Sequence, residues 1–197
     1  MEQNQRDRLI AALTKCLYED GYGKTTVGGI GKQAHISKSV FYELFDDKYQ
    51  CFIAAYDSAV ERMREVVQLA CGGSKDWASG VCAGLSALLA HMAEEPAAAS
   101  LVLVEGLHAG RDLHERFQAA VESFVPYLRE GAPVGVGGGS RPEATDEAVV
   151  GGIASMLGRH VLAGEVERLN EFFPEIAEFA LTPYLGADEA RRIISTA

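Results

Sequence analysis

Apolar residues recur at intervals of three and four positions along nearly the whole chain. In residues 5–20, Leu9, Leu13 and Leu17 form an apolar stripe on a polar helix, and Gly21 follows where that helix would end. No stretch alternates apolar and polar residues as a half-buried strand does. The sequence therefore predicts an all-α protein. Its expected helices cover residues 5–20, about 26–35, about 38–45, 48–71, 76–94, 97–109, 112–130, 145–165, 170–182 and 187–195.

The charge is divided unevenly along a chain whose formal net charge is -10. Residues 1–48 hold seven basic and seven acidic side chains, whereas residues 49–197 hold eleven basic and twenty-one acidic ones. An acidic surface repels phosphate, and a local cation acts over a Debye length of about 8 Å at physiological salt. Any contact with nucleic acid is therefore expected in the first quarter of the chain.

Neither the N-terminus nor the cysteines indicate export or a metal site. The first ten residues are polar, and no apolar run approaches the roughly 18 to 20 residues of a membrane helix. The cysteines lie far apart without a CxxC pair, which is typical of buried thiols rather than of a zinc site or a disulfide framework. We expect a cytoplasmic protein with no membrane partner, no metal and no cofactor. The four cysteines are Cys16, Cys51, Cys71 and Cys82.

Two short helices between residues 26 and 45 are separated only by about residues 35–37, so they must turn sharply, as in a helix-turn-helix. Thr25 or Thr26 can cap the first helix, and Ser37 can cap the second. Asp47 can cap the long helix that follows. The second helix has one apolar arc, expected to pack inward, made of Val40, Phe41, Leu44 and Phe45.

The opposite arc of the second helix is polar and matches the width of the DNA major groove, about 12 Å. Lys38 can reach guanine acceptors or a phosphate, Ser39 a base edge, and the Tyr42 hydroxyl a phosphate oxygen. Glu43 must accept a hydrogen bond from a cytosine amino group or point away from the DNA. From the spacing alone, a helical hairpin that only covers a core is as well supported as a DNA-binding motif. The expected DNA-binding residues are Thr25, Thr26, Ser37, Lys38, Ser39, Tyr42, Glu43 and Lys48, with Thr25, Thr26 and Lys48 placed at helix starts that favour anions.

Many of these positions occur at the fixed spacing of a known family. The segment closely resembles the N-terminal DNA-binding domain of tetracycline-repressor-like (TetR) transcription regulators. It departs from that pattern at Gly31, where alanine is usual, at His35, where glycine is usual, and at Leu44, where a polar residue is common. The run that carries the resemblance, with Gly31 and His35 as its two departures, consists of Thr26, Ile30, Gly31, Ala34, His35, Ile36, Ser37, Tyr42, Phe45 and Lys48.

The resemblance implies two domains and a function. Residues 1–48 would form the helix-turn-helix DNA-binding domain, with the motif itself at about 26–45, and residues 49–197 an effector-binding and dimerisation domain. Helix 48–71 would connect the two, and the Gly- and Pro-rich residues 131–144 would form a flexible loop. The expected function is a repressor that a small-molecule effector releases from a palindromic operator of double-stranded DNA. The protein would be a homodimer rather than an enzyme.

Two apolar surfaces of the second domain are assigned from the resemblance. A broad apolar face near residues 149–162, with a second helix at 170–182, is expected at a two-fold dimer interface, with core packing as the alternative. The expected interface residues are Val149, Ile153, Met156, Leu157, Val161, Phe172 and Phe173. Candidates for the effector pocket are Trp77, Leu85, Leu88, Met92, Leu103, Leu107, His108, Phe117, Val121 and Phe124.

Two other functions remain open on the sequence. The first is a helical protein that binds a small molecule but no operator. The second is a metal-dependent helical-bundle enzyme, since Glu105 and His108 form an ExxH pair, although the chain has no second ExxH. A glycine run at residues 135–140 lacks a preceding strand and is interpreted as a linker rather than a phosphate loop.

Overall fold

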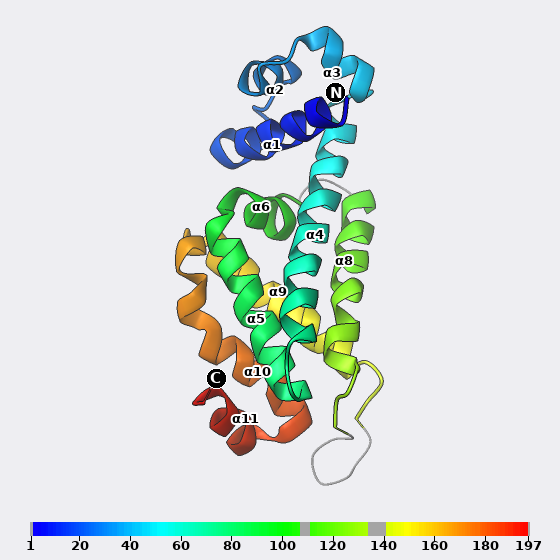
Figure 1. Ribbon diagram of the computed structural model, residues 1–197. Coiled ribbons are helices and arrows are strands. Elements are labelled where there is room, and N and C mark those ends of the chain that lie inside the picture. The colour runs from blue at the N-terminus through cyan, green and yellow to red at the C-terminus, as the bar shows by residue number, and fades with distance from the viewer. Residues whose placement is uncertain (1, 107–110, 134–140, 197) are drawn as a thin grey trace.

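The computed structural model describes residues 2–106, 111–133 and 141–196, and these contain helices and no strands. The predicted all-α fold, with an N-terminal helix-turn-helix and a larger helical part, is confirmed. The first helices are α1 (Glu2–Asp20), α2 (Val27–Ala34), α3 (Lys38–Leu44) and α4 (Lys48–Gly72). Figure 1 shows α1 and two short helices, α2 and α3, at one end of an elongated molecule and a helical bundle below them. The bundle adds α5 (Trp77–Glu94), α6 (Pro96–Ser100), η1 (Leu101–Glu105), α8 (Arg111–Arg129), α9 (Thr145–Leu162), η3 (Val166–Phe172), α10 (Phe173–Leu185) and α11 (Ala187–Ile194).

Side-chain caps fix where the N-terminal helices begin. The Thr26 hydroxyl accepts from the Gly29 backbone N–H at 3.1 Å, and the Ser37 hydroxyl accepts from that of Val40 at 3.3 Å. Asp47 accepts from the Gln50 backbone N–H at 2.8 Å, which begins α4. Each cap satisfies a donor that has no partner within its own helix. These three starts agree with the predicted caps, and Thr26 rather than Thr25 begins α2.

The helix α4 runs through both parts of the molecule. Its first turns pack against α1, and there Phe52 is fully buried and meets the ring of Tyr22, in the turn after α1, edge-on with ring centroids 5.5 Å apart. Its later turns lie between α5 and α8 in the bundle (Figure 1). A single helix of 25 residues therefore joins the N-terminal helices to the bundle.

The segment after α5 differs from the single helix predicted at 97–109. A short helix, α6, begins at Pro96 and gives way to a π-helical turn, η1, which ends at Glu105. Residues 107–110 lie outside the described part of the chain. The π-turn admits one more residue per turn than an α-helix, and such turns occur frequently at functional sites. In Figure 1, α6 lies between α1 and the bundle.

A buried carboxylate holds the lower end of the bundle together. Asp146, at the start of α9, accepts from the Tyr184 hydroxyl at 2.7 Å and from Arg129 Nε at 2.9 Å. Burial alone would raise the pKa of Asp146, but the hydrogen bonds from Arg129 and Tyr184 outweigh it and lower that pKa below its usual value. Helices α8, α9 and α10 are thereby joined at one ionised side chain.

Three further predictions concern the cysteines, a membrane-spanning helix and a metal site. The cysteines are free thiols, but only Cys51 and Cys82 are buried, whereas Cys16 and Cys71 are partly exposed. Among the described residues no single helix is long and apolar enough to cross a membrane; α5 and the following Pro96–Glu105 segment meet that test only as a pair bent by 106°. No three His, Cys, Asp or Glu side chains within the described ranges gather as a metal site, and His108 lies outside those ranges.

Candidate DNA-binding surface and ligand cavity

The turn between α2 and α3 depends on two residues that depart from the family pattern. His35 adopts a left-handed backbone conformation, with φ of 54°, and its N–H donates to the Lys32 carbonyl. The Ile36 N–H donates to the Gly31 carbonyl at 2.8 Å, which completes a Schellman end for α2. A left-handed conformation disfavours a side chain, so His35 carries strain that the two hydrogen bonds offset.

Two arginines of α1 hold the ends of the next two helices. Arg8 Nη2 donates to the Ala34 carbonyl at 2.5 Å, and Arg6 Nη1 donates to the Leu44 carbonyl at 3.4 Å. The Arg6 guanidinium also lies 4.5 Å from the centre of the Phe45 ring. A cation at a helix C-terminus is stabilising because the last carbonyls there lack donors. These two basic side chains therefore fix the angle of the helix-turn-helix.

The outer face of α3 presents the polar side chains predicted to meet DNA. Lys38, Ser39 and Glu43 are exposed, and Tyr42 is 50% exposed. The Lys38 ammonium lies 5.9 Å from the centre of the Tyr42 ring. On the opposite face, Phe41 and Phe45 are buried, while Val40 and Leu44 are partly buried against the same core. Burial of that face leaves the polar residues as the surface of α3.

Two capping hydroxyls remain available to a phosphate. Thr26 and Ser37 are exposed, and each uses an oxygen lone pair to cap its helix. A hydroxyl that accepts one hydrogen bond can still donate another. Both residues therefore lie where they were predicted, at the starts of α2 and α3, with a free donor each.

Thr25 and Lys48 were expected to contact phosphate, and the structure gives both a different role. Thr25 is 4% exposed, and its hydroxyl donates to the Gly21 carbonyl at 2.9 Å. Lys48 Nζ donates to the carbonyls of Tyr22 and Thr25 at 2.7 and 2.8 Å and lies 3.8 Å from the centre of the Tyr22 ring. Loss of hydration lowers the pKa of Lys48. These side chains hold the turn before α2 against α4.

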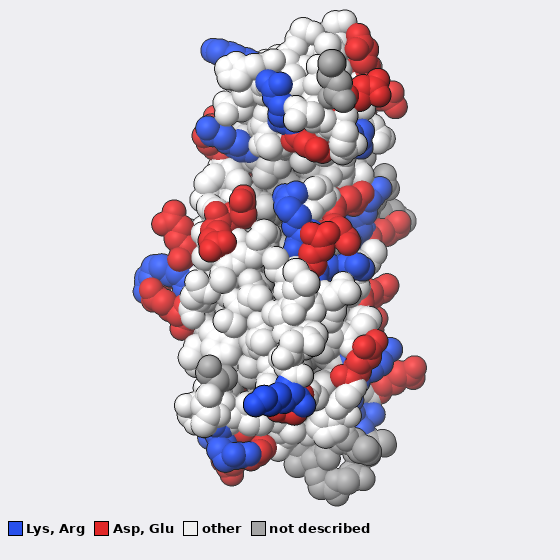
Figure 2. All heavy atoms as spheres, viewed as in Figure 1, with Lys and Arg blue, Asp and Glu red and all other residues white. Residues whose placement is uncertain are grey.

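Figure 2 shows acidic and basic side chains interspersed over the end of the molecule that holds α1 to α3. The visible face has no continuous basic surface. Affinity for phosphate alone would therefore be low there, and binding would depend on the positions of a few donors.

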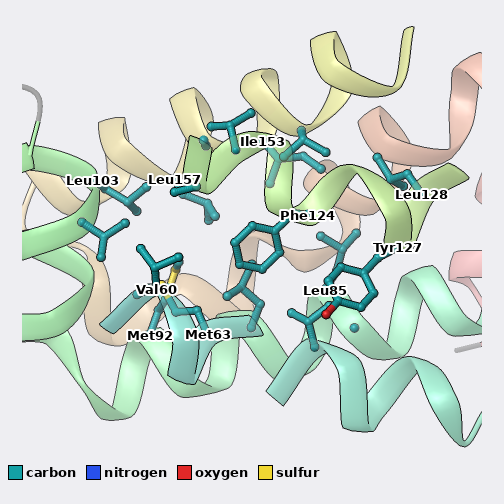
Figure 3. A pocket seen from close by; sticks show the side chains of 18 of the residues that line it. Val60, Met63, Leu85, Met92, Leu103, Phe124, Tyr127, Leu128, Ile153 and Leu157 are labelled. Atoms are coloured by element: carbon teal, nitrogen blue, oxygen red, sulfur yellow. The ribbon is translucent and has the colours of Figure 1, made fainter. Parts of the chain in front are cut away.

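The bundle encloses an apolar cavity of about 100 Å³. Figure 3 shows Leu103 and Leu157 at one end of it, Tyr127 and Leu128 at the other, and Phe124 between. The predicted pocket residues that line it are Leu85, Leu88, Met92, Leu103, Phe117, Val121 and Phe124. The further lining residues are Val60, Met63, Val67, Cys71, Val81, Gly84, Val102, Ala120, Tyr127, Leu128, Val150, Ile153, Ala154 and Leu157.

Among the predicted pocket residues that the structure describes, Trp77 does not line the cavity. Trp77 instead donates from its indole N–H to the Leu128 carbonyl at 2.8 Å and packs on the Tyr184 ring. Leu107 and His108 lie outside the described residues. The missed wall on α4 had a sequence signal, since residues 60, 63, 67 and 71 repeat at helical spacing.

Four of the residues predicted at a dimer interface are buried within the single chain. Val149, Ile153, Leu157 and Val161 are each less than 9% exposed. Ile153 and Leu157 line the cavity, so this face of α9 packs inward. The predicted residues that remain partly exposed are Met156, Phe172 and Phe173.

The outward side of α9 and α10 contains a close aromatic contact instead. The Phe179 ring is 40% exposed, and its Cζ lies 2.5 Å from the position a Cβ on Gly152 would occupy. Leu162, at the end of α9, is 67% exposed. These apolar groups lie on the surface of the single chain.

The fold and the site define a helix-turn-helix protein whose helical bundle encloses an apolar cavity. Residues 9–55 match the family model for bacterial regulatory proteins of the tetR family. That match covers the N-terminal helices and agrees with the resemblance to TetR transcription regulators noted from the sequence. Comparison with curated proteins finds no match.

Solved structures share this fold at low sequence identity. The fatty acid degradation regulator FadR from Bacillus halodurans is 16% identical, with a TM-score of 0.75 over 90% of this chain and 94% of that one. FadR from Bacillus subtilis, solved in complex with stearoyl-CoA, is 15% identical, with a TM-score of 0.73 over 89% and 96%. A TetR family transcription regulator from Marinobacter aquaeolei is 16% identical, with a TM-score of 0.62 over 88% and 95%.

Proposed function

We propose that this protein is a TetR-family regulator, a cytoplasmic homodimeric repressor that leaves a palindromic operator when an apolar effector enters its cavity. The observation that carries the proposal is the position of α4. Its first turns hold the helix-turn-helix through Lys48 and Phe52, and its middle turns line the cavity with Val60 and Met63. A ligand that displaces Val60 or Met63 would therefore act on the same helix that supports the DNA-binding surface.

A second connection supports the same coupling. Val102 and Leu103 of η1 line the cavity, and both α6 and η1 pack against α1. A ligand can shift the equilibrium between two arrangements only by its difference in affinity for them. An effector that pushes η1 away from the cavity centre would favour an arrangement in which α1, and with it α3, is displaced.

The lining favours an apolar effector. Its side chains are almost all aliphatic, aromatic or thioether groups. The free volume of about 100 Å³ is below the roughly 300–1,000 Å³ of typical ligand sites, so side chains must move when the effector binds. Met63 and Met92 are suited to that movement because methionine is flexible. The stearoyl-CoA bound to the B. subtilis relative makes acyl chains the first class to test.

The proposed dimer uses the outward faces of α9 and α10. Phe179 over Gly152, together with Leu162 and the partly exposed Met156, would pack on the same residues of a second copy. Phe172 and Phe173 lie at the start of α10 and would lie at the edge of that contact. A two-fold pair would place its two α3 helices in successive major grooves, about 34 Å apart.

The proposed roles of the domains and residues follow the sequence prediction except at Thr25 and Lys48. Residues 1–48 bind DNA, residues 49–197 bind the effector and dimerise, and the protein uses no cofactor or catalysis. Lys38 and Ser39 meet bases, Glu43 borders them, and Thr26, Ser37 and Tyr42 meet phosphates. Thr25 and Lys48 support the turn that positions these groups.

The test is a gel shift with the DNA upstream of the protein's own gene, run at two salt concentrations. A competitor-resistant band that contains two protein chains supports the proposal. If the protein binds acyl compounds but shows no such band with any upstream fragment, the repressor assignment is wrong.

A further inference from the structure

A buried hydroxyl lies beside the cavity without a partner. Tyr56 is 1% exposed, and its Oη has no hydrogen-bond partner among the described residues. A buried hydroxyl without a partner is costly, and such groups are uncommon in folded proteins. Tyr56 is therefore a candidate for a contact with something other than the chain.

The position of Tyr56 continues the wall of the cavity. It lies one and two helical turns before Val60 and Met63, which line the cavity, and so shares their face of α4. Its Cε2 lies 2.7 Å from the position a Cβ on Gly106 would occupy, so the ring packs on the end of η1. Tyr56 precedes Val60 along α4, so it lies on the side of the cavity nearer the start of that helix, where the N-terminal helices are (Figure 1).

An exposed ion pair borders the same end. Arg116 Nη1 of α8 lies 2.8 Å from both carboxylate oxygens of Asp57 on α4. Asp57 follows Tyr56, and Arg116 precedes the lining residue Phe117. Asp57 and Arg116 also act electrostatically on the Tyr56 hydroxyl, in opposite directions, so the three groups are neighbours in space.

Breaking the ion pair between Asp57 and Arg116 would lower the stability of the fold only slightly. Its side chains are 42% and 53% exposed, and ion pairs in that setting stabilise a fold only slightly. A ligand anion could therefore replace Asp57 as the partner of Arg116. Phe117, the next residue after Arg116, is partly exposed and lines the cavity, so the ion pair and the apolar lining are neighbours along α8.

We propose that Tyr56 and Arg116 bind the polar head of an acyl effector whose chain occupies the cavity. The Tyr56 hydroxyl donates to the acyl carbonyl or carboxylate oxygen, and Arg116 pairs with the negative charge of the head after leaving Asp57. The inference rests on the proposed function, because it assigns the head-group site of the same effector. It predicts that Asp57 competes with the ligand rather than assists it.

The experiment measures three probes on the full-length protein. Diphenylhexatriene is an apolar fluorescent rod without a head group and reports the cavity alone. Decanoate offers a free carboxylate, and decanoyl-coenzyme A offers a thioester with phosphates farther away. The variants are Tyr56→Phe, Arg116→Gln and Asp57→Asn, with Tyr18→Phe and Glu171→Gln as matched controls at exposed sites distant in sequence from the cavity.

The expected pattern separates a head-group site from a structural ion pair. Tyr56→Phe should lower the affinity for the acyl probe by about tenfold, where the probe is whichever of the two binds the wild-type protein. Arg116→Gln should lower the same affinity by a similar factor. Asp57→Asn should instead tighten it severalfold, while diphenylhexatriene binding stays unchanged in all three. A merely structural pair would make Arg116→Gln and Asp57→Asn act in the same direction on every probe.

Three outcomes would each overturn a definite claim. Binding of diphenylhexatriene with no binding of either acyl probe overturns the head-group assignment and leaves an apolar effector in place. Unchanged acyl affinity in Tyr56→Phe and Asp57→Asn overturns it as well. Failure of all three probes on wild type removes the apolar cavity as an effector site, and the proposed function fails with it. Whether decanoate or its thioester binds decides the source of the acyl group, and either one supports the assignment.

Discussion

The carbonyl oxygen of Ile36 lies 2.7 Å from the position that a Cβ atom on Gly31 would occupy. Real side chains do not approach a backbone oxygen so closely, so the turn between α2 and α3 has this geometry only with glycine at 31. Gly31 and His35 are the two positions at which the turn departs from the usual family pattern. The glycine allows the close approach, and the histidine takes the left-handed conformation next to it.

Gly31→Ala should therefore destabilise the protein by about 1–3 kcal/mol, because the added methyl group forces the turn open. Gly28→Ala is the matched control in the same helix, since a Cβ there meets only the Thr26 hydroxyl oxygen, at 4.0 Å. That variant should stabilise by about 0.5–1 kcal/mol through helix propensity. Urea unfolding of both variants checks the pair, and equal effects would show that the turn does not require glycine.

Lys48→Met should lower stability by about 1–3 kcal/mol, because two carbonyls would lose a charged donor. Lys75→Met, at an exposed site between α4 and α5, should be nearly neutral. The salt dependence of DNA binding by the folded Lys48→Met protein should match wild type. A salt slope lower by about one would instead indicate that Lys48 neutralises a phosphate.

Much of the DNA-binding region was predictable from sequence because its determinants are local. Capping residues precede α2, α3 and α4 directly, and the apolar arc of α3 lies within one helix. The role of Lys48 was not predictable, since its partners lie 23 and 26 residues earlier in the chain. A related reason applies to α9, where four of the residues predicted at a dimer interface are buried within the single chain. An apolar stripe in the sequence does not indicate whether it packs against its own chain or against a second copy.

Lys38→Ala should change which operator bases are preferred, whereas Tyr42→Phe should weaken binding to all sequences by a similar factor. The reason is that a lysine can read base edges, while a hydroxyl that meets phosphate carries no sequence information. Binding to a library of operator variants measures both effects. An unchanged preference profile in Lys38→Ala would show that this lysine does not read bases.

Asp146→Asn should cost about 1–3 kcal/mol at pH 7, because the ionised carboxylate accepts from Tyr184 and Arg129 in a buried site. The folded pKa of Asp146 lies below its usual value, so its contribution is present above the unfolded pKa, about 3.9. That contribution is lost as the pH falls through the lower folded pKa. The difference between the two proteins should therefore shrink below about pH 4.

Unfolding measured across that pH range, with the exposed Glu147→Gln as control, tests this prediction. A difference that stayed constant down to pH 2 would mean that the ionised form of Asp146 contributes nothing.

The central claim is that occupation of the cavity controls operator binding. Its most direct test is fluorescence anisotropy of the labelled upstream DNA fragment while decanoate or decanoyl-coenzyme A is added. Trp77 is the only tryptophan and bonds to Leu128 at the cavity wall, so its emission reports in the same sample that the ligand has entered. The account predicts at least a tenfold rise in the Kd for DNA as the Trp77 signal saturates. A saturated Trp77 signal with an unchanged Kd for DNA would contradict it.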